Sequence, residues 1–155
     1  MELADILAER AVLYCTDITA KSQLFEALAV RAAELTGHAL AEILEAITSR
    51  EALGSTGLGN GIAIPHGKLG GLGGVTALFA RLDHPIDFDA VDDQPVDLVI
   101  MLLAPTGAGA DHLKSLSRVA RLLRTDSVVD ALRETDDPAR LHAILTAPLP
   151  NTYAA

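Results

Sequence analysis

The sequence predicts a single α/β domain in which a mixed β-sheet is flanked by α-helices. Its 155 residues, 50% of them hydrophobic, are enough for one domain with a sizeable core. Segments with apolar residues at helical spacing alternate with short apolar runs that are typical of strands. No internal repeat, linker or low-complexity segment divides the chain. We therefore assign residues 1–148 to one domain and residues 149–155 to a flexible tail.

The first third of the chain predicts a short helical turn, a strand and two helices. The turn covers residues 3–8 and the strand covers residues 11–15. Thr19 is the expected N-cap of a helix over residues 20–36, which Gly37 ends. Its core stripe is Leu24, Phe25, Leu28, Ala32 and Leu35. A second helix over residues 39–52 carries Leu40, Ile43, Leu44 and Ile47 on one face and is closed by Gly54.

The rest of the chain predicts three strands and three helices. The expected strands are residues 62–64, which Pro65 ends, then residues 75–82 and residues 96–104. Between them, residues 67–74 are too rich in glycine for regular structure, and residues 83–95 form an acidic loop. The expected helices are residues 110–124, residues 127–134 after a cap at Asp126, and residues 138–146 after the pair Asp137-Pro138. The first of these has the core stripe Leu113, Leu116, Ala120 and Leu123.

Composition excludes several classes of function. With 12 Lys and Arg against 21 Asp and Glu, the formal charge is −9, which argues against a nucleic-acid-binding surface. No apolar run reaches the ~20 residues that span a bilayer, so the protein is not expected to be embedded in a membrane. The N-terminus lacks the pattern of a signal peptide. The single Cys15 fits a reducing compartment and is interpreted as a small hydrophobic residue, so we expect a cytoplasmic protein.

A glycine-rich stretch is the strongest candidate for a functional site. It reads GSTGLGNGIAIPHGK and covers residues 54–68, with glycine at positions 54, 57, 59 and 61. Such a backbone can adopt positive φ and approach another group closely. His66 follows the expected strand and Pro65, and Gly67 leaves one side of the imidazole uncrowded. His66 is therefore either a reactive histidine or a residue that caps the strand end by hydrogen bonding.

Two further residues are candidates to share an anion with His66. His112 lies in the first turn of an expected helix, where free N–H groups and the helix dipole favour anions. Arg50 lies in the last turn of the helix before the glycine-rich stretch, within reach of a phosphoryl group on His66. Each also has a purely structural interpretation, as a polar residue at a helix start and as a cation at a helix end. The other histidines, His38, His84 and His142, are expected on the surface.

Other motifs do not fit the glycine-rich stretch. A Walker A loop would need glycine at the position of Ile62 and Ser or Thr at the position of Leu69. A dinucleotide-binding fingerprint would need a strand before the glycines and a helix after them, which is the reverse of the expected order. No zinc-binding pattern and no GxSxG elbow is present. The sequence therefore predicts no cofactor and no metal.

The run GSTGLGNGIAIPHGK resembles the active-site signature of the enzyme IIA domains of the phosphoenolpyruvate-dependent phosphotransferase system, in the mannitol/fructose-like class. Within that class it is most similar to the nitrogen-regulatory members. The resemblance extends over nearly the whole chain and implies the α/β fold of that class. It also implies that His66 accepts a phosphoryl group, on Nε2, from an HPr-type phosphocarrier protein. Arg50 matches an arginine that lines the active site of the family.

The constellation supports phosphoryl transfer, with His66 as acceptor and His112 and Arg50 as groups that neutralise charge on the phosphoryl oxygens. We take Thr56, Asn60, Gly61 and Gly67 as binding residues of the same site. Asn60 stands where some mannitol-type members have an acidic residue, which favours regulation over sugar transport. No IIB, IIC or HPr segment is seen in the sequence. The resemblance then implies regulatory targets such as potassium transporters or sensor kinases.

Two kinds of function therefore remain open. In the first, the protein is a phosphocarrier whose His66 takes and gives a phosphoryl group. In the second, the same surface docks transporters or sensor kinases and the covalent chemistry is secondary or lost. A role as the IIA component of fructose or mannitol uptake is a further alternative.

Overall fold

The computed structural model describes residues 2–148; the expected tail at residues 149–155 lies outside them. Six strands of this described part form one mixed sheet in the order β1-β5-β6-β3-β2, with β4 also paired to β6. The strands are β1 (Val12–Cys15), β2 (Gly57–Gly59), β3 (Ile62–Ala63), β4 (His66–Leu69), β5 (Thr76–Ile86) and β6 (Val96–Pro105). The helices are α1 (Lys21–Thr36), α2 (Leu40–Ala52), α3 (Ala110–Leu122), α4 (Asp126–Arg133) and α5 (Pro138–Thr146), with 3₁₀ turns η1 (Leu3–Asp5) and η2 (Glu9–Ala11).

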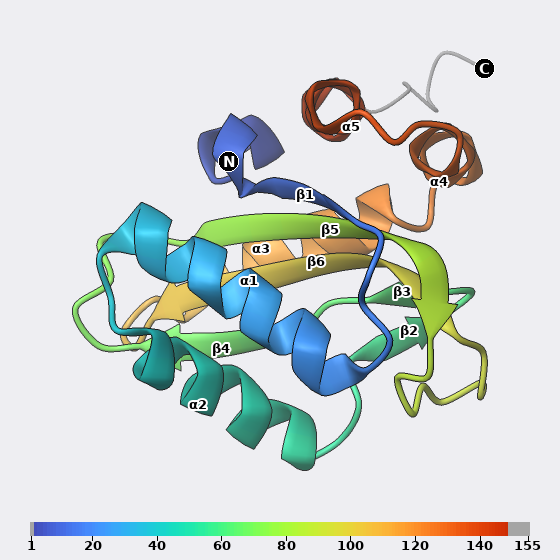
Figure 1. The fold of residues 1–155 in the computed structure, drawn as a ribbon. Coiled ribbons are helices and arrows are strands. Elements are labelled where there is room, and N and C mark those ends of the chain that lie inside the picture. The colour runs from blue at the N-terminus through green and yellow to red at the C-terminus, as the bar shows by residue number, and fades with distance from the viewer. Residues whose placement is uncertain (1, 149–155) are drawn as a thin grey trace.

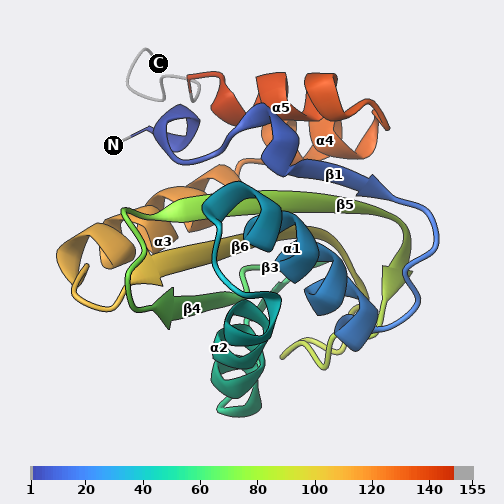
Figure 2. The ribbon, with the colours of Figure 1, turned by 60° about the vertical axis from the view of Figure 1, so that its left-hand side comes forward.

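Helices cover both faces of the sheet. Helices α1 and α2 lie on one face and α3 on the other, while α4 and α5 lie beyond β1 (Figures 1 and 2). Strand β6 is the centre of the sheet, since it pairs antiparallel with β5 and parallel with both β3 and β4. This arrangement is the predicted mixed α/β domain. It brings the starts of β3 and β4 beside a single central strand.

The apolar run of β6 explains why this strand lies at the centre. Residues Leu98–Ala104 are all buried, with exposed fractions of 0%. A strand of this kind must be covered on both faces, and here helices on both sides of the sheet do so. The predicted strand over residues 96–104 is confirmed to within one residue.

Several expectations about the elements were wrong. The N-cap of α4 is Thr125, because Asp126 is already the first residue of the helix, and Leu40 of α2 is 39% exposed. Residues 67–74 do not lack regular structure, because β4 runs to Leu69, and β5 continues through Ile86 into the segment expected as a loop. The N-cap of α1 is Ala20, because the Thr19 hydroxyl instead donates to the Gln23 side chain. In α3 the buried residues are His112, Ser115, Val119 and Leu122, so the core stripe is offset by one position. Leu113, expected in the core, is 65% exposed.

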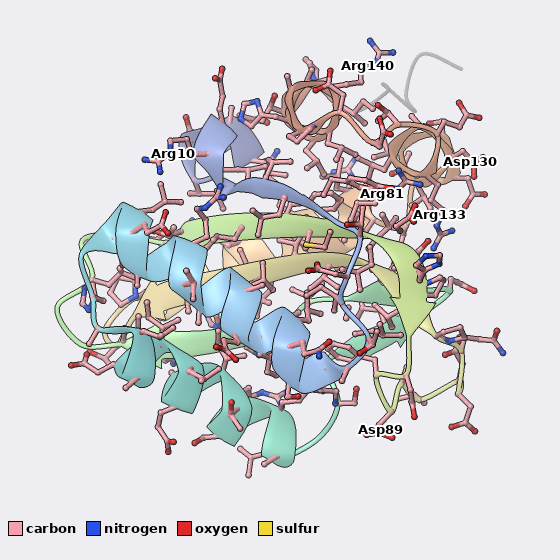
Figure 3. The ribbon with its side chains drawn as sticks, viewed as in Figure 1. Arg10, Arg81, Asp89, Asp130, Arg133 and Arg140 are labelled. Atoms are coloured by element: carbon pink, nitrogen blue, oxygen red, sulfur yellow. The ribbon has the colours of Figure 1, made fainter. Side chains whose placement is uncertain are left out.

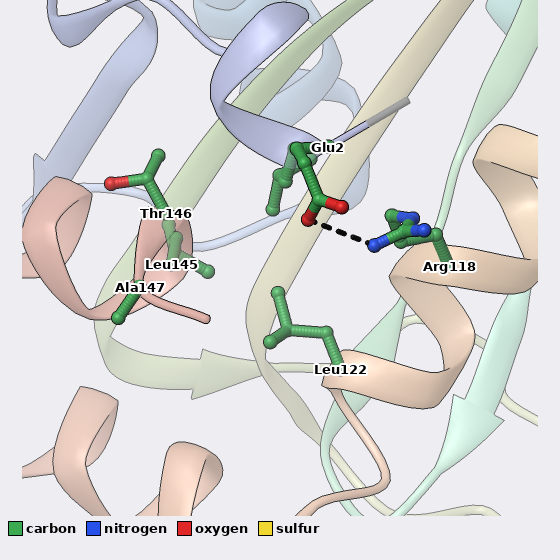
Figure 4. A pocket seen from close by; sticks show the side chains of 7 residues that line it. Glu2, Arg118, Leu122, Leu145, Thr146 and Ala147 are labelled. Carbon is green, nitrogen blue, oxygen red and sulfur yellow. Dashed lines mark hydrogen bonds and ion pairs between the residues drawn. The ribbon is translucent and has the colours of Figure 1, made fainter. Parts of the chain in front are cut away.

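The N-terminal turn packs where α3 and α5 meet. Glu2 accepts a hydrogen bond from Arg118 Nη1 at 3.0 Å across a crevice that Leu122 and Leu145 line (Figure 4). The crevice has a volume of about 20 Å³, which is room for roughly one water molecule. Both charged side chains are largely exposed, so this ion pair adds at most about 1 kcal/mol of stability. The crevice is not a ligand site.

Candidate functional site

His66 begins the edge strand β4 and lies opposite Leu102 of β6. Along β4 the side chains alternate, with Gly67 and Leu69 buried and His66 and Lys68 on the other face, half-buried and exposed respectively. The imidazole is therefore held by a strand rather than by a free loop. Its partner strand β6 fixes the position of its backbone.

Gly67 allows helix α2 to approach β4 closely. A Cβ atom at Gly67 would lie 3.2 Å from the backbone of Ala46 in α2. A larger side chain there would push the helix away from the strand. The glycine that was expected to leave room beside the imidazole thus brings α2 against the strand that carries His66.

A single hydrogen bond sets the tautomer of His66. Its Nδ1 lies 2.9 Å from the carbonyl oxygen of Ile64. Because a carbonyl only accepts hydrogen bonds, Nδ1 carries the proton and donates it. The lone pair of a neutral imidazole is then on Nε2. This nitrogen is the one that can act as a nucleophile.

A chain of hydrogen bonds leads from Ile64 to the buried carboxylate of Glu51. The Ile64 N–H donates to the Thr56 carbonyl at 3.0 Å. The Thr56 N–H and hydroxyl both donate to Glu51, and Lys21 Nζ donates to Glu51 Oε2 at 3.0 Å. Glu51 is 9% exposed, so its charge is held almost entirely by these partners. The Thr56 hydroxyl, a candidate phosphoryl contact, is thus bonded to Glu51.

Sequence reasoning missed Glu51, although a signal was present. The apolar positions Ile43 and Ile47 of α2 are four residues apart, and Glu51 is the next position at this spacing. A carboxylate on the buried face of a helix requires hydrogen-bond donors. Lys21 and Thr56 supply them.

His112 lies beside His66, as predicted. It is the third residue of α3, whose first turn has no side-chain cap, and the two imidazole centroids are 5.5 Å apart. Burial, with the nearby charges of His66 and Lys68, lowers the pKa of His112 below its ordinary value of 6.5. Its Nδ1 is buried without a hydrogen-bond partner among the described residues. This ring nitrogen therefore retains hydrogen-bonding capacity that no described residue uses.

Arg50 lies in the last turn of α2, one turn beyond the Ala46 contact with Gly67. Its Nη1 donates to the Gly54 carbonyl at 2.9 Å, which closes the helix end. In residues 2–148 this bond engages one of the five N–H donors of the guanidinium. This contact matches the structural interpretation of Arg50 as a cation at a helix end. The other N–H donors of the guanidinium are left able to bind an anion.

Lys68 is a further basic residue near His66, although the sequence did not assign it to the site. It lies two residues after His66, on the same face of β4, and its charge lowers the pKa of His112. Two-residue alternation along a strand could have predicted this placement. Lys68 adds positive charge to the side of the sheet where His66 and His112 meet.

Asn60 and Gly61 are not brought to His66. They form the turn between β2 and β3, where Asn60 has a φ of 58° and donates its N–H to Asp92 Oδ2. Strand β3 pairs with Leu98 of β6, whereas His66 pairs with Leu102. Four residues of strand separate these points, or about 13 Å. The predicted binding residues of the glycine-rich stretch therefore divide between two ends of β6.

The remaining candidates lie elsewhere. His84 is exposed, as expected, whereas His38 is partly buried and His142 is half-buried with Nε2 bonded to the Leu7 carbonyl. Cys15 packs against the core, and burial raises its pKa. In residues 2–148 no group of three or more His, Cys, Asp or Glu side chains is placed to hold a metal ion. No helix among these residues is long and apolar enough to cross a membrane.

A family model described as "Phosphoenolpyruvate-dependent sugar phosphotransferase system, EIIA 2" matches residues 5–147. The chain belongs to this family. As an EIIA 2 protein it is a phosphotransfer component of that system, and proteins of the family interact with phosphocarriers and other components of it. The resemblance stated for the glycine-rich stretch is thereby confirmed.

Relatives of this EIIA 2 protein include regulatory ones. It is 49% identical over 148 residues to the nitrogen regulatory protein of Bradyrhizobium diazoefficiens, which covers 96% of this chain and 97% of that one. The crystal structure of the nitrogen regulatory protein IIA-Ntr from Neisseria meningitidis matches with a TM-score of 0.87 and 35% identity, over 93% of this chain and 99% of that one. IIA mannitol from Escherichia coli matches with a TM-score of 0.74 and 20% identity, over 89% and 97% of the two chains, and shows the shared fold.

Proposed function

We propose that the protein is a regulatory histidine phosphocarrier that accepts a phosphoryl group on Nε2 of His66 from an HPr-type phosphocarrier protein. The observation that carries this proposal is the hydrogen bond from Nδ1–H of His66 to the Ile64 carbonyl. It fixes the ring and leaves the Nε2 lone pair available before any partner arrives. No reorientation of the nucleophile is needed during transfer.

The transfer exchanges one phosphorus–nitrogen bond for another. The Nε2 lone pair of His66 attacks the phosphorus of a donor phosphohistidine, and the bond to the donor nitrogen breaks as the new bond forms. The donor imidazole keeps that electron pair, while His66 keeps its Nδ1 proton. Such a step requires in-line positioning and neutralisation of the phosphoryl oxygens rather than an acid or base.

Three groups are proposed to neutralise those oxygens. The ring of His112 lies 5.5 Å from that of His66, and Lys68 lies on the same face of β4 as His66. Arg50, in the last turn of α2, is assigned to the site from the family resemblance. A phosphoryl group raises the pKa of a neighbouring imidazole, so His112 is expected to take up a proton when His66 is phosphorylated. A protonated imidazole then donates a charge-assisted hydrogen bond to the phosphoryl oxygen.

The regulatory branch is proposed from the relatives. The 49% identity to a nitrogen regulatory protein extends over nearly all of both chains, whereas the mannitol IIA protein shares 20% identity. We therefore propose a cytoplasmic protein whose phosphorylation state is sensed by other proteins, among them potassium transporters or sensor kinases. Transport of fructose or mannitol is the weaker alternative.

The first test is the intact mass of the protein after incubation with phosphoenolpyruvate, enzyme I and an HPr-type carrier. We expect one added phosphate on the wild type that acid treatment removes, and none on His66→Ala. Nitrogen-15 NMR of the phosphorylated imidazole is expected to show phosphorus coupled to Nε2. No added mass, with both upstream proteins active on a control acceptor, would overturn the phosphocarrier and leave a binding regulator.

A further inference from the structure

A cavity of about 630 Å³ lies between α1, α2 and the loop that follows β5. In Figure 1 the first turn of α1 and the last turn of α2 lie side by side next to this loop, and Figure 3 labels Asp89 on it. The cavity has the size of a small-molecule site. It is separate from the His66–His112 pair, because neither histidine lines it.

The walls of the cavity are mainly apolar. Phe25 and Leu44 line it from the two helices, together with Ala52. The hydroxyl groups of Ser22 and Thr48 add hydrogen-bonding capacity among these residues. Walls of this kind favour a ligand with an apolar body and few polar atoms.

The charges of the cavity favour a cation. One lining cation, Lys21, faces three lining carboxylates, those of Glu26, Glu51 and Asp89. Lys21 already donates to Glu51 and lies 4.4 Å from the centroid of the Phe88 ring. Within residues 2–148, the carboxylates of Glu26 and Asp89 have no hydrogen-bond or ion-pair partner. Two of the three lining carboxylates are therefore left without a counterion.

We propose that this cavity binds a small amphipathic organic cation, with its ammonium or guanidinium group at Glu26 and Asp89 and its apolar body against Phe25 and Leu44. A cation with a hydrocarbon or aromatic body satisfies both the unpaired carboxylates and the apolar walls. A small anion meets net negative charge there, and a neutral apolar molecule leaves the carboxylates unpaired.

The bound cation is also expected to influence His66, and this part rests on the proposed function. The floor of the cavity contains the Lys21–Glu51 pair, which begins the chain of hydrogen bonds through Thr56 and Ile64 to Nδ1 of His66. A cation near Lys21 changes the charge balance at Glu51. Because hydrogen bonds in a chain polarise one another, a change at Glu51 is transmitted toward the imidazole.

The test is a set of NMR titrations of the full chain with three matched probes: phenethylammonium, phenethyl alcohol and phenylacetate. We expect phenethylammonium to shift the amide signals of Lys21–Glu26, Thr48–Ala52 and Asp89 in a saturable way, with at least about tenfold weaker binding of the other two probes. No saturable shifts in these segments, or equal shifts with all three probes, would overturn the site.

Variants distinguish recognition of the ligand's charge from non-specific apolar binding. The double change Glu26→Gln with Asp89→Asn keeps shape, and Asn tolerates the positive φ of 54° at Asp89. It is expected to weaken phenethylammonium binding about tenfold, whereas Glu45→Gln on the exposed side of α2 leaves it unchanged. Equal binding by the double variant and the wild type would contradict the proposed contacts.

The link to His66 has its own measurement. Saturation with phenethylammonium is expected to shift the ring nitrogen signals of His66 in the wild type but not in Glu51→Gln. Binding without any shift at His66 overturns the link to the phosphoryl site. Since these titrations contain no phosphoryl donor, their outcome is independent of whether His66 is phosphorylated.

Discussion

The β5–β6 pair and the segment from Gly54 to Leu69 are held in place by different forces. The β5–β6 pair runs antiparallel from Thr76 opposite Leu103 to Arg81 opposite Leu98 and is covered by apolar side chains on both faces. The other segment contains strands of three, two and four residues. Polar contacts from Glu51, Asp92 and Arg133 and close glycine packing hold it.

This difference separates stability from function. Apolar contacts in β5 and β6 are many and non-directional. One substitution there therefore lowers the global stability without displacing a specific group of the site. Polar contacts in the site segment are few and directional, so one substitution moves a particular backbone group. We therefore expect changes in the strand pair to lower stability most, and changes in the site segment to alter the reactivity of His66.

The largest expected effect on stability is that of Ile100→Ala in β6. Ile100 is fully buried opposite Phe79, and its truncation leaves a cavity in the core beside the sheet. We expect the free energy of unfolding to fall by about 2–5 kcal/mol, as measured by urea denaturation. The folded variant is expected to accept a phosphoryl group at the wild-type rate.

Leu113→Ala is the matched control for this change. Leu113 is 65% exposed on α3, so the same kind of truncation removes little buried surface. Its expected effect on the unfolding free energy is within about 0.5 kcal/mol. A loss as large as that of Ile100→Ala would mean that Leu113 is buried, as the sequence pattern alone suggested.

Glu51→Gln is expected to have a smaller effect on stability but the largest effect on reactivity. The neutral amide leaves Lys21 without its counter-charge and weakens the anchor of Thr56. We expect a loss of about 1–3 kcal/mol of stability and a rate of His66 phosphorylation at least about tenfold lower. The phosphorylation rate is measured by rapid-quench labelling with a phosphorylated HPr-type carrier.

Two variants control for general damage in Glu51→Gln. Glu45→Gln changes an exposed carboxylate of the same helix and is expected to leave both quantities unchanged. Glu51→Asp keeps the charge and is expected to recover part of the rate. If Glu51→Gln phosphorylates as fast as the wild type, the chain from Glu51 to His66 has no role in positioning the imidazole.

Gly61→Ala compares the two ends of the site segment. Gly61 has a φ of 81°, and a Cβ there would lie 2.5 Å from Arg133 Nη2 and 3.0 Å from Asp97 Oδ1. We expect thermal unfolding to show a loss of about 1–2 kcal/mol, with the rate of His66 phosphorylation within about twofold of the wild type. If Gly61→Ala lowers the rate of His66 phosphorylation as much as Glu51→Gln does, Asn60 and Gly61 belong to the phosphoryl site after all.

The helices and strand β6 were also predicted from the sequence more accurately than the segment from Gly54 to Leu69. Strand β6 and helices α1, α2 and α5 were predicted to within about two residues, since apolar spacing and caps such as Asp137 are local signals. The prediction that His66 and His112 lie together agrees with their 5.5 Å ring separation, whereas the place of Arg50 at the phosphoryl site stays a prediction. These placements follow from the order of the elements and from a motif that stands in one short stretch.

The site segment was less predictable because distant residues determine it. Strand β4 depends on pairing with β6 and on the contact of Gly67 with Ala46, and neither is visible in the local glycine pattern. The position of Asn60 depends on Asp92 and Arg133, which are 32 and 73 residues away in the chain. Glu51 was missed because its partners Lys21 and Thr56 come from two other elements.

The smallest expected effect is a pH dependence of stability that comes from His112. Burial lowers the pKa of His112 in the folded protein below 6.5, its ordinary value. As the pH falls from about 6.5, the unfolded chain binds a proton at this residue before the folded one does, so stability decreases with decreasing pH. The contribution is fully present above pH 6.5 and is lost as the pH falls through the folded-state pKa.

The measurement is the urea midpoint of the wild type and of His112→Gln between pH 5 and 7.5. Carboxylates titrate in both proteins, so the difference between the two profiles isolates His112. We expect the wild type to lose stability more steeply than the variant on acidification below about pH 6.5. Parallel profiles would mean that His112 binds its proton equally well in the folded and unfolded chains. A steeper loss of stability in the variant would mean that the folded protein favours the charged imidazole even without a phosphoryl group.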